Sequence, residues 1–180
     1  MIVDHFEIEG LLLIKPIIFS DERGEFYETY SLSKYSALGI PENFLQDNES
    51  ISKKNVLRGL HFQLPPHDQG KLVRVIKGAA LDVAVDIRKH SPTYGKYIMV
   101  ELSEENKNQF WIPSGFAHGF LSLADETIFT YKCTNLYNKE SESGFLWNDK
   151  DINIQWNIDN PIVSEKDIQL ASFSSFNSPF

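Results

Sequence analysis

Apolar and polar residues alternate in short runs along most of the chain, which is the pattern of strands with one face in a core. From Phe44 onward these runs follow one another without a helical period between them, and short turns rich in Pro and Gly separate them. We expect strands over Phe44–Asn48, Asn55–Gln63, Lys71–Lys77, Ala80–Ile87, Tyr97–Leu102, Asn108–Ile112, Gly119–Ala124 and Glu126–Thr134. Many closely spaced strands without intervening helices predict an all-β sandwich or barrel, and we expect a jelly-roll barrel.

The two ends of the chain are less regular. Residues 2–19 are expected to be extended, and Glu25–Tyr30 alternates charged and aromatic residues as a half-buried strand does. Residues 33–38, closed by Gly39 and Pro41, predict a short helix. The polar segment after residue 138 is expected to fold back as helical turns over one end of the barrel. We therefore predict a single domain over residues 1–180, with a C-terminal extension from about residue 138.

Composition and charge narrow the function classes. The net charge of -8 argues against non-specific nucleic-acid binding, which needs a basic surface. Cys133 is the only cysteine, so no intrachain disulfide can form; we expect it to be a small core residue in a cytoplasmic protein. The apolar run Leu11–Ile18 is too short and too interrupted to span a bilayer, so we expect no membrane segment.

The first candidate for chemistry is the pair of predicted strands Asn55–Gln63 and Lys71–Lys77. They carry Arg58, His61 and Lys71 in segments that otherwise have the pattern of buried strands. Charge inside a strand is costly without a partner, so these residues predict an anion-binding pocket that contains a titratable histidine. Strict alternation would put Arg58 and His61 on opposite faces, because they are three residues apart. Gly59 lies between them, where a bulge would bring both to one face.

Four further polar residues lie in or beside apolar strands. The turn Pro113–Gly115 delivers His118 to the start of a strand, and Tyr131 lies in an aromatic strand. Asp82 and Asp86 share one face of the strand Leu81–Ile87. A carboxylate that points into a barrel should be paired, and Lys71 or His61 are the candidate partners of Asp82.

Metal-dependent catalysis is one hypothesis, because β-barrels of this type commonly hold a metal. Such a site needs three or four His or carboxylate ligands, often with two His separated by one residue. His61 is followed by Phe62 and Gln63, His67 lies in a loop flanked by Pro, and His5 and His90 have no ligand-like neighbours. We therefore expect no metal and no cofactor.

Metal-free proton transfer is the other hypothesis. Removing a proton next to a carbonyl needs a base, a cation near the oxygen that becomes negative, and an acid on the opposite face. His61, Lys71 and Tyr131 are residue types that can fill these three roles.

The chain resembles the dTDP-4-dehydrorhamnose 3,5-epimerases, the nucleotide-sugar epimerases of the rhamnose pathway. The matching segments run in the family's order from about residue 19 to 167. They are Asp21–Phe26, Gln46–Asn48, Val56–Gln63, Gln69–Val75, Asp82–Arg88, Ser91–Gly95, Trp111–Phe120, Tyr131-Lys132, Trp147–Asp149 and Ser164–Asp167. Such an ordered set is far more specific than any single motif.

The resemblance implies a cupin-like jelly roll, also called a double-stranded β-helix, that forms a homodimer without metal and acts on dTDP-4-dehydro-6-deoxy-glucose. It implies that His61 removes the protons at C3 and C5 and that Asp167 holds the His61 ring, with Asp82 as a second candidate partner. Lys71 would stabilise the enolate oxygen, and Tyr131 would return a proton from the other face. The positions expected to contact the substrate are Arg23, Glu28, Gln46, Asn48, Arg58, His118, Glu142 and Lys166.

Two positions depart from the family pattern. Asn157 stands where proline is more usual, and Glu49 where histidine is more usual. An epimerase that inverts only one centre of a related 4-keto-6-deoxy-sugar nucleotide is therefore an alternative. A catalytically silent nucleotide-sugar binding protein is another, although binding alone would not require His61, Lys71 and Tyr131 together.

Overall fold

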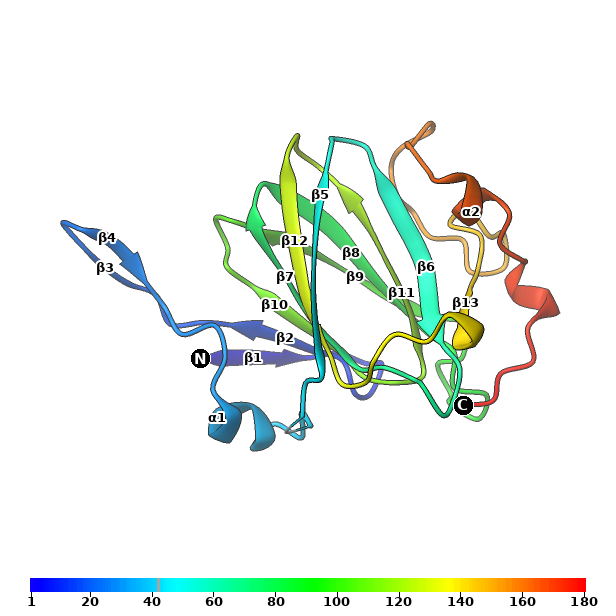
Figure 1. Ribbon diagram of the computed structural model, residues 1–180, viewed down its shortest axis with the longest axis horizontal. Coiled ribbons are helices and arrows are strands. Elements are labelled where there is room, and N and C mark those ends of the chain that lie inside the picture. Colours follow the sequence, from blue (N-terminus) through cyan, green and yellow to red (C-terminus); the bar gives the residue numbers. More distant parts are fainter. Residues whose placement is uncertain (42) are drawn as a thin grey trace.

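A computed structural model describes residues 1–41 and 43–180 and contains two antiparallel sheets that face each other, with a separate two-stranded arm (Figure 1). The six-stranded sheet has the order β1-β2-β10-β7-β12-β5, and the five-stranded sheet has the order β13-β6-β11-β8-β9. The strands are β1 (Ile2–His5), β2 (Leu12–Lys15), β3 (Phe19–Asp21), β4 (Gly24–Phe26), β5 (Gln46–Ser52), β6 (Leu57–Gln63), β7 (Lys71–Lys77), β8 (Ala79–Asp86), β9 (Tyr97–Ser103), β10 (Gln109–Ile112), β11 (Phe116–Ser122), β12 (Thr127–Cys133) and β13 (Glu142–Gly144). The predicted all-β, cupin-like jelly roll is confirmed.

Strand positions follow the predicted pattern closely in the middle of the chain. β7 begins at Lys71 and ends at Lys77, as expected. The sequence pattern predicts a strand that begins at Gly119, but β11 begins three residues earlier, at Phe116, directly after the turn at Gly115. His118 therefore lies inside the strand. The pattern of this strand hides its start because all residues from Phe116 to Ser122 are buried and no alternation is visible.

The arm formed by β3 and β4 contradicts the prediction of a half-buried strand over Glu25–Tyr30. β4 ends at Phe26 and pairs only with β3, and every residue of both strands is exposed. Figure 1 shows this arm leading away from the two sheets. The alternating pattern is present in the sequence, but within this chain the aromatic face of the arm has no surface to cover, and Phe26 is 72% exposed.

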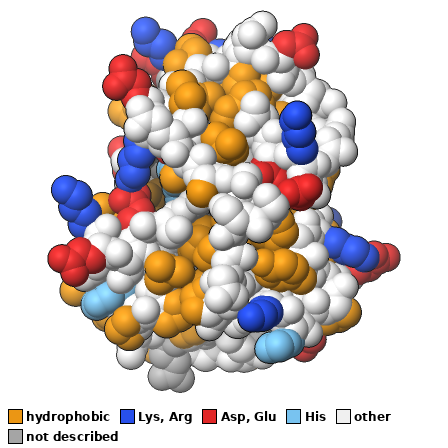
Figure 2. Space-filling model, turned by 90° about the vertical axis from the view of Figure 1, so that its right-hand side faces the viewer, with side chains coloured by type: hydrophobic (Ala, Val, Ile, Leu, Met, Phe, Trp, Pro, Cys, Tyr) orange, Lys and Arg blue, Asp and Glu red, His pale blue; other side chains and the backbone are white. Residues whose placement is uncertain are grey.

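Successive side chains of a strand point to opposite faces, so apolar residues form one core between the two sheets and another on the outer face of the five-stranded sheet. The inner core includes Val73, Phe110 and Phe129. On the outer face, Phe62 packs against Phe145 and against residues that follow α2. The segment after residue 144 thus covers a sheet face rather than one end of the barrel, and β13 pairs with β6. Figure 2 looks onto this side, where hydrophobic side chains come to the surface between charged ones.

The helices are short. They are α1 (Leu32–Ser36), the 3₁₀ turns Lys139–Ser141 and Phe173–Ser175, and α2 (Glu165–Ile168). α1 confirms the predicted helix and packs Tyr35 beside Leu72 and Trp111 on the outer face of the six-stranded sheet. No helix in the described residues is long and apolar enough to cross a membrane.

The predicted irregularity at Gly59 is confirmed. His61 pairs with His118 and Arg58 with Phe120, so three steps along β6 oppose two steps along β11. The extra residue in β6 brings Arg58 and His61 to the same, inner face, while Leu57 and Leu60 both face the outer core. Gly59 has φ +133°, and the Gly59–Leu60 peptide is cis. A Cβ at Gly59 would lie 2.5 Å from Gly119 Cα, so no larger residue fits between the two strands.

We expect Gly59→Ala to lower the free energy of unfolding far more than Gly24→Ala. Both glycines have a positive φ, which costs a residue with a Cβ about 1–3 kcal/mol. Gly24 has open space around it, whereas a Cβ at Gly59 meets the backbone of β11. The clash should add about 2 kcal/mol or more. Urea denaturation of the two variants measures the difference, and equal losses would contradict the close approach of β6 and β11.

Candidate active site

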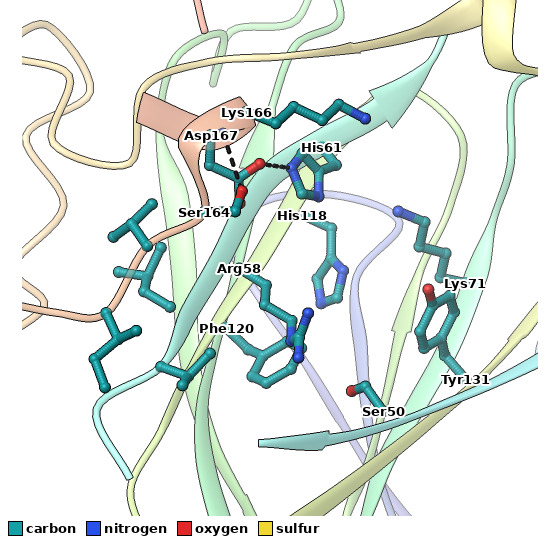
Figure 3. A pocket seen from close by; sticks show the side chains of 14 residues that line it. Ser50, Arg58, His61, Lys71, His118, Phe120, Tyr131, Ser164, Lys166 and Asp167 are labelled. Atoms are coloured by element: carbon teal, nitrogen blue, oxygen red, sulfur yellow. Dashed lines mark hydrogen bonds and ion pairs between the residues drawn. The ribbon is translucent and has the colours of Figure 1, made fainter. Parts of the chain in front are cut away.

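A cavity of about 530 Å³ opens between the two sheets, with β6 and β11 on one side and β5, β7 and β12 on the other (Figure 3). Its lining consists of Ser50, Val56, Leu57, Arg58, His61, Lys71, His118, Phe120, Tyr131, Ile162, Val163, Ser164, Lys166 and Asp167. A second cavity of about 320 Å³ shares His61, Lys71 and Tyr131 with it and adds Gln46, Asn48 and Glu142. The fold therefore gathers most of the predicted site residues around one space.

His61 is held by Asp167 from α2. The distance between His61 Nε2 and Asp167 Oδ1 is 2.7 Å, and the second carboxylate oxygen accepts the backbone N–H of Gly59 at 3.3 Å. Ser164 caps α2 by accepting the N–H of Asp167, which fixes the position of that residue. Burial works to raise the pKa of Asp167, but the hydrogen bonds from His61, Gly59 and Ser164 outweigh it and hold the pKa below its usual value.

The Asp167 contact sets the tautomer of His61. An ionised carboxylate can only accept a hydrogen bond, so Nε2 carries the proton and Nδ1 is left as the basic atom. Figure 3 shows the second ring nitrogen on the cavity side. Of the two candidate partners from the sequence, Asp167 is the one that binds His61.

Lys71 reaches the cavity from the first position of β7, across from His61. Burial lowers the pKa of Lys71, while the charges of Cys133, Asp82 and Glu142 oppose that shift. A cation in such a dry position acts strongly on any negative charge that forms beside it.

Tyr131 lies beside Lys71, on the neighbouring strand β12. Its hydroxyl points toward the Lys71 side chain in Figure 3, and burial raises the pKa of Tyr131, so the phenol keeps its proton. Cys133 follows two residues later and is buried, as predicted, with its thiol accepting a weak hydrogen bond from Asn48 at 3.6 Å.

Asp82 does not bind Lys71 or His61, which corrects the expected pairing. It pairs with His118, with 2.8 Å between His118 Nε2 and Asp82 Oδ2. Asp82 on β8 pairs with Phe120 on β11. Its inward side chain therefore lies beside that of His118, which is also on β11. Asp86, also inward, binds Arg88, Ser91 and Thr93 instead. Pairing across strands depends on the register, which the sequence pattern alone does not fix.

The mouth of the site carries an ion pair between Glu142 and Lys166. The distance is 2.6 Å, and Tyr137 donates a further hydrogen bond to Glu142 at 2.8 Å. Gln46 and Asn48 line the same side, and Gln46 Nε2 donates to Asn48 Oδ1. These contacts join β13, α2 and β5 around the entrance, where the sequence predicted substrate contacts.

Arg58 lies on the inner face of β6 and is exposed to the cavity. Its Nε donates to Ser52 Oγ at 3.2 Å, and within residues 1–41 and 43–180 no carboxylate forms an ion pair with it. A guanidinium held in this way can bind an anionic ligand with its remaining N–H groups.

Arg23 and Glu28 lie outside this cavity. Arg23 is on the β3–β4 arm, pairs with Asp21 at 2.6 Å, and its side chain is 85% exposed. Glu28 pairs with Lys34 at 2.8 Å. One chain therefore brings together all of the residues predicted to contact substrate except Arg23 and Glu28.

Several lining residues were not predicted. Ser50, Tyr137 and Gln69 have no distinctive spacing, and Val56, Ile162 and Val163 are apolar residues that any core can use. Ile162 comes to the site through a bridge with Val56, a contact between distant segments that no local pattern indicates. Across the part of the chain that the structure describes, no group of three or more His, Cys, Asp or Glu residues has the arrangement of a metal site.

Comparison with known proteins agrees with this geometry. The family model for dTDP-4-dehydrorhamnose 3,5-epimerase matches residues 5–175. The enzyme of that name from Shigella flexneri is 54% identical over 168 residues, which is 93% of each chain. The crystal structure of the Elizabethkingia anophelis epimerase superposes with a TM-score of 0.94 at 46% identity and covers 99% of both chains. The Legionella pneumophila epimerase in complex with dTDP-4-keto-L-rhamnose superposes with a TM-score of 0.93 at 46% identity, over 97% of this chain and 94% of that one.

Likeness of this extent leaves one assignment: the chain belongs to the dTDP-4-dehydrorhamnose 3,5-epimerase family.

Proposed function

We propose that the chain inverts C3 and C5 of dTDP-4-dehydro-6-deoxy-D-glucose by metal-free proton transfer, giving dTDP-4-dehydro-L-rhamnose. The observation that supports this mechanism is that His61, Lys71 and Tyr131 line one cavity. His61 lies on β6 of the five-stranded sheet, and Lys71 lies on β7 of the six-stranded sheet. This arrangement supplies a base, a cation and an acid around one space, which is what proton transfer next to a ketone needs.

His61 removes the proton in this mechanism. Its Nδ1 faces the cavity, and the Asp167 carboxylate on Nε2 stabilises the imidazolium that forms. The electron pair of the broken C–H bond moves into an enolate whose oxygen is the C4 oxygen of the sugar. Lys71, whose ammonium is little solvated, stabilises the negative charge on that oxygen.

Tyr131 completes each inversion. The carbon takes a proton from the phenol on the face opposite His61, the ketone forms again, and the configuration is reversed. Solvent then takes the proton from His61 and returns one to the Tyr131 phenolate before the second centre reacts. Burial keeps the phenol protonated until this step, because it raises the pKa of Tyr131. His61 and Tyr131 come from β6 and β12, which lie in different sheets, so a sugar ring between the sheets can be reached from both faces.

The nucleotide part of the substrate is expected at the end of the cavity where Arg58 lies. Arg58 has free N–H groups suited to the diphosphate, and Lys166 adds a second cation. Gln46, Asn48 and Glu142 at the entrance, together with His118, complete the substrate contacts that we assign to this chain.

Arg23 and Glu28 fit the proposal only if a second copy supplies them. The arm that carries Arg23 leads away from the barrel and exposes Phe19 and Phe26, so it offers an apolar surface to another chain. We therefore propose a homodimer in which the arm of one chain reaches the cavity of the other. The lone buried thiol of Cys133 fits a reducing compartment, and we expect the enzyme in the cytoplasm.

In deuterated water, the substrate should gain deuterium at both C3 and C5, as read by NMR. His61→Ala should slow exchange by at least about 100-fold because the base is missing. His90→Ala, which changes an exposed histidine, is the matched control and should exchange at the wild-type rate. Label at one centre only would favour the single-centre epimerase, and no label with the wild-type protein would leave the silent binding protein as the remaining reading.

Tyr131→Phe should separate exchange from inversion. His61 can still remove protons, so part of the deuterium exchange should survive, but the carbon loses its acid on the far face. NMR of the product is expected to show little or none of the doubly inverted sugar. Unchanged product stereochemistry would refute the assigned role of Tyr131.

Co-expression of two inactive chains tests the dimer. The Arg23→Ala and His61→Ala variants should each have low activity when expressed alone. A mixed dimer of the two contains one site with a normal His61 and a normal arm from the partner. If the chains pair at random, the mixture should recover about a quarter of the wild-type rate. Recovery no greater than the sum of the two separate variants would exclude an arm that acts across the dimer.

A further inference from the structure

The Asp82–His118 pair is a second histidine–aspartate contact beside the same cavity, and the proton-transfer steps do not use it. Asp82 is fully buried on β8, and Nε2 of His118 lies 2.8 Å from its Oδ2. The other oxygen, Oδ1, has no hydrogen-bond partner in the part of the chain that the structure describes. An incompletely satisfied buried carboxylate is costly, so the pair needs an explanation.

The pair fixes which nitrogen of His118 carries a proton. A carboxylate only accepts, so Nε2 is the protonated nitrogen, and Nδ1 has a free lone pair. Burial lowers the pKa of His118, Asp82 opposes that shift, and the nearby Lys71 and His61 lower the pKa further. The ring is therefore neutral. Phe129 packs at 6.1 Å between ring centroids, and the side chain is only 8% exposed, so the ring has little room to turn over.

A neutral ring of this tautomer presents an acceptor to the cavity. Figure 3 places His118 between Arg58 and the pair formed by Lys71 and Tyr131. The long polar side chains of the lining are mostly donors, since arginine and lysine have no acceptor. Asp167 is occupied by His61 and Gly59, and His61 Nδ1 is reserved for the reacting proton. His118 Nδ1 is thus a buried acceptor available to a neutral donor on the substrate, in addition to the oxygens of Ser50 and of Glu142, Gln46 and Asn48 at the entrance.

We propose that Asp82 is a positioning residue that sets His118 as a hydrogen-bond acceptor for a hydroxyl group of the sugar, and so makes His118 select substrates that carry this hydroxyl. The inference rests on the proposed function, because that substrate has hydroxyl groups at C2 and C3. It also excludes a role of His118 as donor to the enolate oxygen, since Nδ1 has no proton to give.

Selection follows from the cost of leaving a buried acceptor unpaired. A sugar nucleotide that lacks the hydroxyl would displace water from His118 without replacing its hydrogen bond. One of two analogues, the 2-deoxy or the 3-deoxy sugar nucleotide, lacks the hydroxyl that His118 accepts. For that analogue we expect the kcat/KM of deuterium exchange at C5 in wild-type protein to be about 10- to 100-fold lower than for the substrate. The C5 centre is common to both analogues, so the same reaction is compared throughout.

The experiment measures both the tautomer of His118 and the discrimination between the substrate and the deoxy analogue. Nitrogen-15 NMR of the imidazole should show wild-type His118 neutral, with the proton on Nε2. Asp82→Leu removes the acceptor from Nε2, so the proton should move to Nδ1, and discrimination between the substrate and the analogue should fall to within about threefold. Asp86→Asn changes the next inward carboxylate of β8, outside the cavity, and should keep both the tautomer and the discrimination.

Asp82→Asn keeps the inference testable if Asp82→Leu does not fold. The amide can offer either its oxygen or its NH₂ group to Nε2, and discrimination should follow whichever tautomer the NMR spectrum shows. A wild-type proton on Nδ1, a charged ring at neutral pH, or discrimination that does not change with the tautomer would overturn the inference. Absence of exchange in wild-type protein would instead refute the proposed epimerisation, while the tautomer could still be read.

Discussion

The close crossing of β6 and β11 at Gly59 and Gly119 is the constraint on which the site depends. A Cβ on Gly59 would meet Gly119 Cα, and a Cβ on Gly119 would lie 2.8 Å from the Arg58 carbonyl oxygen. Because both residues are glycine, the strands can approach while β6 carries one extra residue. That extra residue puts Arg58 and His61 on the inner face and keeps Leu57 and Leu60 in the outer core. The residue proposed to bind the diphosphate and the proposed base therefore lie on the same strand.

Most of the charged groups around the cavity are paired with an oppositely charged group nearby. His61 is paired with Asp167, His118 with Asp82, and Lys166 with Glu142. Lys71 has no direct carboxylate partner among the described ion pairs, and burial lowers its pKa. An ammonium that is poorly solvated before the reaction gains most when a negative oxygen forms beside it. The lack of a close counterion at Lys71 therefore suits its proposed role of stabilising the negative charge on the enolate oxygen.

The sequence predicts the strands well where one face of the sheet is buried and the other is not, as in β7, whose ends match the prediction. It predicts β11 less well, since this strand is buried on both faces and its pattern has no period. The prediction of a half-buried strand over Glu25–Tyr30 is wrong because alternation indicates an amphipathic strand but not whether the chain supplies a surface to cover it. The position of Gly59 between Arg58 and His61 allowed a geometric prediction from local sequence, and it is confirmed.

Partners of buried side chains are harder to predict than strands. The sequence brought Asp82 into the barrel correctly but gave it the wrong partner, because the β8–β11 register decides that it meets His118. Asp167 lies 106 residues from His61 and reaches it through a four-residue helix whose position depends on packing against β6. Such long-range contacts were available from family resemblance, where whole motifs are compared, and not from hydrophobic periodicity.

His61 and His118 have the same hydrogen-bond arrangement, but they can have different chemistry because their burial differs. Each donates Nε2–H to an aspartate and keeps Nδ1 as the nitrogen with a free lone pair. The His61 side chain is 32% exposed, so solvent and Asp167 can support a positive ring during proton transfer. His118 is 8% exposed and lies near Lys71, where a second positive charge is disfavoured. Burial therefore separates a residue that can become charged from one that stays a neutral acceptor, and one cavity obtains both from the same pair of residue types.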